Sequence, residues 1–331
     1  MRVQTKFYKN AGGHVLLDEK EILLNKSENS CVILRILYCG ICNSDIKEVK
    51  GERISRRDFG HECLGIIIDK FDLEIAIGSF VVLDPHIQVN RDTCFAEAVK
   101  ISGSKSNLKD ALIVVPTMDV KWVLTEPLAC SVHACKRLLS SNFNPKKILV
   151  YGAGFFGFLI YSYLTEKKKN TFISNRSEER IDIIETLTNK LNRFSLNEDV
   201  NEKFDAVVIS QSFVSTEDID LLLPYLKNNA NILLFGAVHP GTSLNLFNIR
   251  NNELVENKRY KKKQIRLIGT LGANNRDFIE ALDLLNSPPF ENKICKIISS
   301  IVDIEQGHLL INKMSNGTLL FGKQIVRFAE T

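Results

Sequence analysis

The sequence predicts an α/β protein of two domains, in which a strand-rich domain is followed by a doubly wound parallel sheet. The chain has 331 residues, which is long for a single hydrophobic core. Residues 1 to about 120 form short β-rich runs separated by polar turns, a pattern typical of a barrel-like domain with few helices. From Lys146 onward, apolar strand-like runs alternate with helical ones, which predicts parallel strands joined by helices.

Each expected element has its own signal. Runs of β-branched and aliphatic residues predict strands over 31–38, 64–69 and 79–83, and apolar residues at helical spacing predict a helix over 128–139. The alternating region predicts strands at 147–151, 171–174, 206–210, 231–235 and 265–269, with helices at 157–166, 219–227 and 276–286. We therefore expect domains at residues 1–123 and 124–272, and a C-terminal segment, 273–331, that returns to the first domain.

Composition narrows the class of protein. The hydrophobic fraction of 44% and the charged fraction of 25% are those of a globular protein. The net charge is +4, and the basic residues are dispersed apart from two lysine triplets, so we expect no nucleic-acid partner. No apolar run is long enough to span a bilayer, and the N-terminus lacks a signal-peptide core. The eight scattered cysteines fit the reducing cytoplasm better than a disulfide framework.

A glycine fingerprint follows the strand predicted at 147–151. Gly152 allows a tight turn, Gly154 lets a pyrophosphate approach the backbone, and Gly157 lets the next helix pack against the strand. The intervening Phe155 and Phe156 lie at the helix N-terminus, which favours anions. The pattern predicts a Rossmann dinucleotide-binding domain, although a glycine-rich turn without a ligand is the simpler alternative.

The end of the next strand indicates which nicotinamide cofactor is bound. An NAD site usually carries Asp or Glu there to bind the ribose hydroxyls. This strand instead ends in Ser174, Asn175 and Arg176, with Arg180 shortly after. Because arginine and serine can bind a 2′-phosphate, NADP(H) is favoured over NAD(H). The alternative is that Asn175 binds the ribose diol and Arg176 lies near adenine.

A second group of residues carries metal-ligand chemistry. Cys42 supplies a thiolate, and the adjacent His61 and Glu62 supply an imidazole and a carboxylate. Glu126 opens the helix before the nucleotide domain and can be a fourth ligand that exchanges with water. Sulfur, nitrogen and oxygen ligands together suit a catalytic Zn²⁺. Taken singly, His61 is more often a core histidine and Cys42 an apolar filler.

These motifs resemble those of the zinc-dependent medium-chain dehydrogenase/reductase superfamily, most closely its polyol (sorbitol) and threonine dehydrogenase branch. The matching segments, in order, are Gly40-Ile41-Cys42-Asn43-Ser44-Asp45, Gly60-His61-Glu62, Glu126-Pro127-Leu128-Ala129 with Val132-His133-Ala134, the glycine fingerprint, and Gly322-Lys323-Gln324-Ile325-Val326. The resemblance implies a GroES-like catalytic domain joined to the Rossmann domain. It implies a zinc ion held by Cys42, His61 and Glu62, with Glu126 or water fourth. It also implies that Ser44 relays the substrate proton and that Asp45 orients the ligand loop.

Three departures from the family pattern change these expectations. Cys94 stands alone where the family often has four cysteines for a structural zinc, so we expect one zinc per chain. Lys47 replaces a frequent histidine, so the proton path beyond Ser44 can differ. The usual connecting loop between Val115 and Glu126 is missing, which can leave one wall of the cleft open.

The sequence therefore predicts a zinc-dependent NAD(P)(H) oxidoreductase that interconverts a secondary alcohol (a polyol, sugar or cyclitol) and a ketone. The alternatives are a zinc-free quinone-type reductase and a non-catalytic NADP-binding protein of the same fold. Arg53, Arg56 and Arg57 can hold an acidic substrate, but a solvated loop is the simpler reading. The resemblance suggests a homodimer or homotetramer.

Overall fold

The structure is a computed structural model, and it describes residues 2–24, 30–52, 59–140, 144–188, 190–196 and 201–329. Arg53, Arg56 and Arg57 lie outside the described residues. The chain forms two compact units, one of Met1–Glu126 with Ile298–Thr331 and the other of Pro127–Ile297. The C-terminal return was expected at residue 273. The structure corrects this to Ile298, because α8 (Asn275–Leu285) packs on α9 (Pro288–Ile294), which in turn packs on α4 (Phe155–Glu166) of the second unit.

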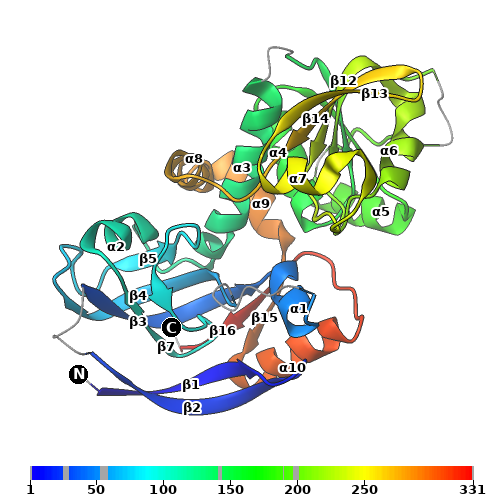
Figure 1. Ribbon diagram of the computed structural model, residues 1–331. Coiled ribbons are helices and arrows are strands. Elements are labelled where there is room, and N and C mark those ends of the chain that lie inside the picture. Colours follow the sequence, from blue (N-terminus) through cyan, green and yellow to red (C-terminus); the bar gives the residue numbers. More distant parts are fainter. Residues whose placement is uncertain are drawn as a thin grey trace. The chain divides into compact units, whose positions relative to one another are not determined.

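The first unit is rich in strands (Figure 1). Its strands are β1 (Arg2–Asn10), β2 (Val15–Leu23), β3 (Cys31–Ile41), β4 (Glu62–Phe71), β5 (Phe80–Leu83), β6 (Asn90–Arg91), β7 (Ala98–Ser102), β8 (Leu112–Val115), β15 (Ile298–Asp303) and β16 (Lys323–Arg327). Its helices are α1 (Asn43–Val49), α2 (Lys105–Ala111), α10 (Ile304–Ser315) and the 3₁₀ helix η1 (Val120–Leu124).

Strand β3 organises this unit. It pairs with β4, β7 and β16, in a sheet whose main path is β15-β16-β3-β4-β5-β8. All of its residues except Arg35 are buried, which explains its continuous apolar sequence. The antiparallel register places Gly40 opposite Glu62. The end of β3, which leads to Cys42, therefore meets the start of β4, which follows His61.

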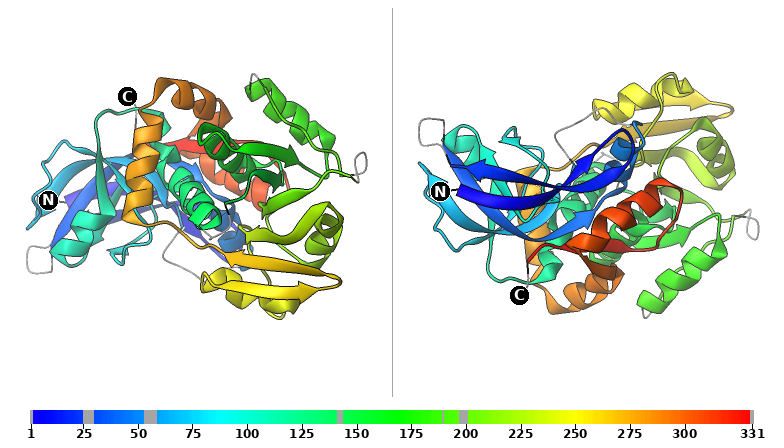
Figure 2. Two further views of the ribbon diagram at one scale, coloured as in Figure 1. Left: turned by 90° about the horizontal axis from the view of Figure 1, so that it is seen from above. Right: turned by 90° about the horizontal axis from the view of Figure 1, so that it is seen from below.

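The hairpin of β1 and β2 lies beside α10, as the right-hand view of Figure 2 shows. The Asn312 side chain joins them, because its Oδ1 accepts from Val15 N at 2.8 Å and its Nδ2 donates to Val15 O at 2.8 Å. The C-terminal helix thus closes the N-terminal hairpin onto the unit.

The second unit alternates helices and strands. Its strands are β9 (Lys147–Tyr151), β10 (Asn170–Ser174), β11 (Phe204–Ile209), β12 (Leu226–Leu234), β13 (Val255–Tyr260) and β14 (Lys263–Gly269). Its helices are α3 (Thr125–Ser140), α4 (Phe155–Glu166), α5 (Glu178–Leu187), α6 (Thr216–Leu222), α7 (Leu246–Asn251), α8 and α9, with the 3₁₀ helices η2 (Leu223–Tyr225), η3 (Ser243–Asn245) and η4 (Cys295–Ile297).

The sheet order is β10-β9-β11-β12-β14-β13. Five of these strands are parallel, as expected for a doubly wound sheet, and β13 adds an antiparallel edge. The helix expected over 219–227 ends at Leu222, and β12 begins at Leu226. Pro224 between them lacks the amide hydrogen that a continuing helix needs.

None of the helices in the described part of the chain combines the length and hydropathy needed to cross a membrane.

Candidate metal and dinucleotide sites

Three predicted ligands converge in the first unit. Cys42, His61 and Glu62 are all buried, and one ligand atom from each lies within 4.8 Å of the others. Cys42 caps α1, whereas His61 and Glu62 come from the segment that opens β4. The pairing of β3 with β4 brings these two segments together although they are distant in sequence. A thiolate, an imidazole and a carboxylate in this arrangement suit a zinc ion.

Asp45 connects the two segments. Its Oδ2 accepts from Cys42 N at 2.8 Å, its Oδ1 accepts from Gly60 N at 2.9 Å, and the same Oδ1 lies 3.6 Å from His61 Nδ1. Desolvation lowers the pKa of His61, but the Asp45 carboxylate and the Cys42 sulfur outweigh it and leave the pKa raised. Gly60 has φ +65°, and a Cβ there would meet Phe95 N at 2.7 Å. Glycine is therefore required at the turn that delivers His61.

Glu62 has one oxygen in an ion pair and the other without a hydrogen-bond partner among the described residues. Its Oε2 accepts from Lys323 Nζ at 2.5 Å, and Lys323 also donates to Ile41 O at 3.2 Å. Burial raises the pKa of the Glu62 carboxyl, and the Lys323 ammonium acts in the opposite direction. A Cβ on Gly40 would lie 2.4 Å from Glu62 Oε2. Gly40 therefore leaves the space that this ion pair occupies.

The residues fit a metal ion. Glu62 Oε1 is a buried oxygen with no hydrogen-bond partner among the described residues, and such an atom is costly unless a ligand satisfies it. Ser44 Oγ is also buried without a partner in the described part of the chain. Ser44 lies in the first turn of α1, two residues beyond Cys42. The site thus offers a metal ligand and a hydroxyl that can exchange a proton.

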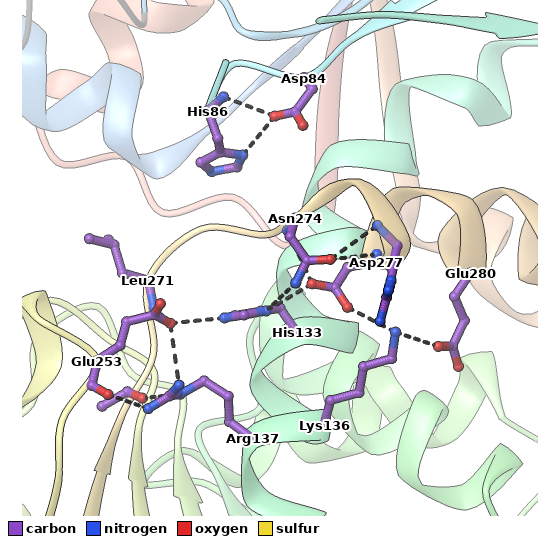
Figure 3. A network of polar contacts seen from close by, with 12 residues as sticks. Asp84, His86, His133, Lys136, Arg137, Glu253, Leu271, Asn274, Asp277 and Glu280 are labelled. Atoms are coloured by element: carbon purple, nitrogen blue, oxygen red, sulfur yellow. Dashed lines mark hydrogen bonds and ion pairs between the residues drawn. The ribbon is translucent and has the colours of Figure 1, made fainter. Parts of the chain in front are cut away.

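Glu126, the expected fourth ligand, does not belong to the group of Cys42, His61 and Glu62 whose ligand atoms all lie within 4.8 Å of one another. It is 7% exposed at the start of α3, and a carboxylate oxygen lies within 4.8 Å of a ring nitrogen of His86. His86 is held by Asp84, whose Oδ1 lies 3.0 Å from His86 Nδ1 (Figure 3). Desolvation lowers the pKa of His86, but Asp84 and Glu126 outweigh it and the pKa is raised. The sequence interpretation missed His86, which has no motif around it.

The glycine fingerprint folds as expected in the second unit. Gly152 has φ +115°, and a Cβ on Gly157 would lie 1.8 Å from Gly152 O, so both positions require glycine. Gly154 is the N-cap of α4, and the first turn of this helix contains no acidic side chain. A Cβ on Gly154 would meet nothing closer than Arg180 Nη1 at 3.8 Å. The backbone is therefore open at the helix N-terminus, where a pyrophosphate would bind.

The aromatic residues of the fingerprint pack together and onto a neighbouring strand end. Phe155 and Phe156 have ring centroids 5.2 Å apart, and Phe156 lies 5.0 Å from Phe235, which follows β12. Both fingerprint phenylalanines are half-buried. These rings therefore support the start of α4.

Asn175 holds the glycine loop against the end of β10. Its Oδ1 accepts from Ala153 N at 3.0 Å, and its Nδ2 donates to Ser177 O at 3.1 Å. Ser174 is 1% exposed, and its carbonyl accepts from Gly152 N at 2.8 Å. The structure thus places Ser174 and Asn175 in the scaffold of the loop.

Arg176 already has an anionic partner. Its Nη2 lies 2.7 Å from Asp218 Oδ1, and its Nε donates to Tyr151 Oη at 3.2 Å. The Arg176 side chain is 65% exposed, whereas that of Asp218 is 2% exposed. Asp218 was missed in the sequence, because it lies in α6, far along the chain from β10.

A polar network surrounds His133, the histidine of the Val132-His133-Ala134 motif. Asp277 Oδ2 lies 2.8 Å from its Nδ1, and Glu253 Oε1 lies 2.8 Å from its Nε2 (Figure 3). Lys136 Nζ donates to Asp277 Oδ1 at 2.9 Å, and Arg137 Nε donates to Gly269 O at 2.7 Å. The network joins α3 to α8 and to the segment before β13, so it supports the second unit.

Comparisons with known proteins agree with this fold. No known protein-family profile matches the chain. It is 27% identical over 258 residues to glucose 1-dehydrogenase 1 of Picrophilus torridus, covering 64% of this chain and 70% of that protein. The crystal structure of L-idonate 5-dehydrogenase from Escherichia coli is 16% identical, with a TM-score of 0.73 over 99% of both chains. That of S. aureus TarJ in complex with NADPH is 16% identical, with a TM-score of 0.73 over 98% of this chain and 99% of that one.

The chain therefore has the fold of the medium-chain dehydrogenases, an α/β architecture of a GroES-like unit and a Rossmann unit. The resemblance found in the sequence is confirmed at the level of the fold.

Proposed function

We propose that the protein is a zinc-dependent NADP(H) oxidoreductase that interconverts a secondary alcohol, in a polyol, sugar or cyclitol, and the corresponding ketone. The observation that carries the proposal is the convergence of Cys42, His61 and Glu62, in which Glu62 Oε1 is buried and has no hydrogen-bond partner in the part of the chain that the structure describes. The glycine loop of the second unit supports the nucleotide part of the proposal, since the backbone of Gly152 and the close packing at Gly157 both require glycine there.

The chain's own residues have distinct roles in this reaction. Cys42, His61 and Glu62 would hold the metal, which supplies a Lewis acid that lowers the pKa of an alcohol hydroxyl. Asp45 orients the first two of these ligands through Cys42 N and the His61 ring. Ser44 Oγ accepts the hydroxyl proton and passes it toward solvent. In the reductive direction, Ser44 returns a proton to the carbonyl oxygen.

The nucleotide site supplies the second reactant. A nicotinamide cofactor held in this unit would supply hydride-transfer chemistry to the substrate. The N-terminus of α4 and the loop of Gly152, Gly154 and Gly157 bind the pyrophosphate, and Asn175 keeps that loop against β10. Arg176 follows β10 and Arg180 lies in the first turn of α5; two cationic side chains there would attract a 2′-phosphate, which supports NADP(H).

The similar proteins support an oxidoreductase, since two of them are named as dehydrogenases of a sugar or sugar acid and the third was crystallised with NADPH. Assembly as a homodimer or homotetramer remains a prediction from the family resemblance.

A substrate screen tests the proposal. The zinc-loaded protein is assayed with polyols, cyclitols, sugars and their ketones, each with NADP(H) and with NAD(H), by the absorbance of the reduced nicotinamide. Reversible turnover of at least one alcohol and ketone pair, lost in Cys42→Ala, is expected. Turnover that is equal in Cys42→Ala would favour a zinc-free reductase. Nucleotide binding without turnover of any pair would favour a non-catalytic NADP-binding protein.

A further inference from the structure

The carboxylate that NAD sites carry at the end of the second strand is missing from β10, but a carboxylate from another element pairs with Arg176, which follows that strand. Asp218 lies in the first turn of α6 and accepts from Ser215 N at 2.9 Å and from Ser215 Oγ at 3.1 Å through Oδ2. Its other oxygen, Oδ1, lies 2.7 Å from Arg176 Nη2. Both oxygens are engaged, so Asp218 is fixed in position.

This ion pair changes the charge that a cofactor would meet. Arg176 follows β10, at the point where dinucleotide folds bind the adenosine ribose. Its side chain is 65% exposed and can reach a ligand, yet the buried carboxylate beside it offsets its charge. A 2′-phosphate, which carries a charge of about −1.5 to −2, is attracted by Arg176 and repelled by Asp218. A ribose diol is neutral and responds to neither charge strongly.

We propose that Asp218 is a specificity-determining residue for the cofactor, which weakens the preference for NADP(H) that Arg176 alone would give and keeps NAD(H) usable. The inference rests on the proposed nucleotide site. Asp218 acts through the charge and the orientation of Arg176 and is therefore a positioning residue. The Tyr151 hydroxyl, which accepts from Arg176 Nε at 3.2 Å, holds the guanidinium in the same orientation.

Equilibrium binding of the nucleotides tests this, measured by calorimetry on the full chain with NADPH, NADH, and the probes adenosine 2′,5′-bisphosphate and 5′-AMP. Asp218→Asn keeps an acceptor for Ser215 N and removes the negative charge. We expect it to tighten NADPH and the bisphosphate about tenfold, while NADH and 5′-AMP change less than about threefold. Ser215→Ala is the matched control, because it removes the hydrogen bond from Ser215 Oγ but leaves the negative charge of Asp218 in place. The ratio of NADPH affinity to NADH affinity should therefore stay as in the wild type.

A second pair of variants keeps the test independent of how well Asp218→Asn folds. Arg176→Ala leaves Asp218 unpaired, and NADPH binding should fall by about a hundredfold with little change for NADH. The double variant Arg176→Ala/Asp218→Asn should recover part of that loss.

An unchanged NADPH to NADH ratio in Asp218→Asn, or no recovery in the double variant, would overturn the inference while leaving the proposed function intact. Failure of the wild-type protein to bind either nucleotide would instead overturn the proposed function.

Discussion

Cys39 and Cys42 are close in sequence but differ in their surroundings. Cys39 is fully buried beside Cys63 on β4, and burial raises the pKa of its thiol well above the ordinary value. Cys42 lies with His61 and Glu62. A thiol that resists ionisation suits neither a metal ligand nor a reactive dithiol. Cys39 is therefore a packing residue, and Cys42 is the proposed ligand.

We predict that Cys42→Ala lowers turnover to below about a hundredth of the wild-type rate, since it removes a proposed metal ligand. Cys39→Ala should leave turnover within about threefold and lower the free energy of unfolding by about 1 kcal/mol, because only one buried sulfur is lost. Steady-state kinetics and zinc content of both variants measure this. Equal losses of turnover would show that the two cysteines act as a pair.

Two glycines of the fingerprint should respond differently to a methyl group. In Gly157→Ala the new Cβ would lie 1.8 Å from Gly152 O, so we expect the free energy of unfolding to fall by about 1–3 kcal/mol, the usual penalty for overpacking. In Gly154→Ala the nearest atom would be Arg180 Nη1 at 3.8 Å. Stability should then change little, but NADPH should bind at least tenfold more weakly, since the methyl group occupies the approach of the pyrophosphate.

Thermal unfolding and nucleotide calorimetry on the two variants check this. If Gly154→Ala binds NADPH as the wild type does, the pyrophosphate does not lie on this loop.

At the scale of elements, the His133 network makes the stability of the second unit depend on pH. Hydrogen bonding to Asp277 raises the pKa of His133 against the effect of desolvation, and Glu253 adds to the rise. Because the pKa of His133 is raised on folding, the stability that its charged form contributes is complete below pH 6.5, the pKa in the unfolded chain. That contribution is lost as the pH rises through the pKa of His133 in the folded protein. For Asp277, desolvation is outweighed by His133 and Lys136, which lower its pKa to about 2. The stability that the Asp277 carboxylate contributes is fully present above pH 3.8, its pKa in the unfolded chain, and is lost as the pH falls toward 2.

We therefore expect His133→Gln to destabilise the second unit by about 2 kcal/mol near pH 6, the loss of charged hydrogen bonds, with the difference from wild type narrowing as the pH rises above about 6.5. Segment-resolved hydrogen exchange of α3 and α8 is the suitable measurement, because the single tryptophan, Trp122, lies in the other unit. His14→Gln, an exposed histidine of the first unit, is the control. A difference in stability between His133→Gln and the wild type that stays constant from pH 5 to pH 9 would contradict an ionic role for His133.

The sequence predicted most elements because their patterns are local. The strand expected at 147–151 has the same bounds as β9 (Lys147–Tyr151), since a buried parallel strand is a continuous apolar run. β13 was missed because its residues alternate in exposure and most of them are polar or charged, as at an edge. The helix expected over 219–227 was too long because Pro224 was overlooked.

The candidate site residues also divide into those found from local motifs and those whose role depends on contacts between distant segments. Cys42, His61 and Glu62 stand in recognisable motifs, and the fold brings them together. Lys323, Asp218 and His86 were missed as site residues, because their roles depend on partners from other elements. Lys323 meets Glu62 only through the pairing of β16 with β3. Such contacts leave no spacing signal in the chain.

At the scale of the whole molecule, the two units carry separate parts of the proposed chemistry. The proposed metal ligands Cys42, His61 and Glu62 belong to the first unit, and the glycine loop belongs to the second. Metal loss should therefore abolish turnover without abolishing nucleotide binding. The absence of the four-cysteine lobe from the sequence further predicts one zinc per chain.

The most direct test is a zinc titration of the metal-free protein, in which bound zinc, turnover of an alcohol found in the substrate screen and NADPH affinity are measured on the same samples. Turnover should rise in proportion to bound zinc and level off at one equivalent per chain, while NADPH affinity stays constant throughout. Full turnover without zinc, or turnover that rises until two equivalents are bound, would contradict a single catalytic zinc held by Cys42, His61 and Glu62.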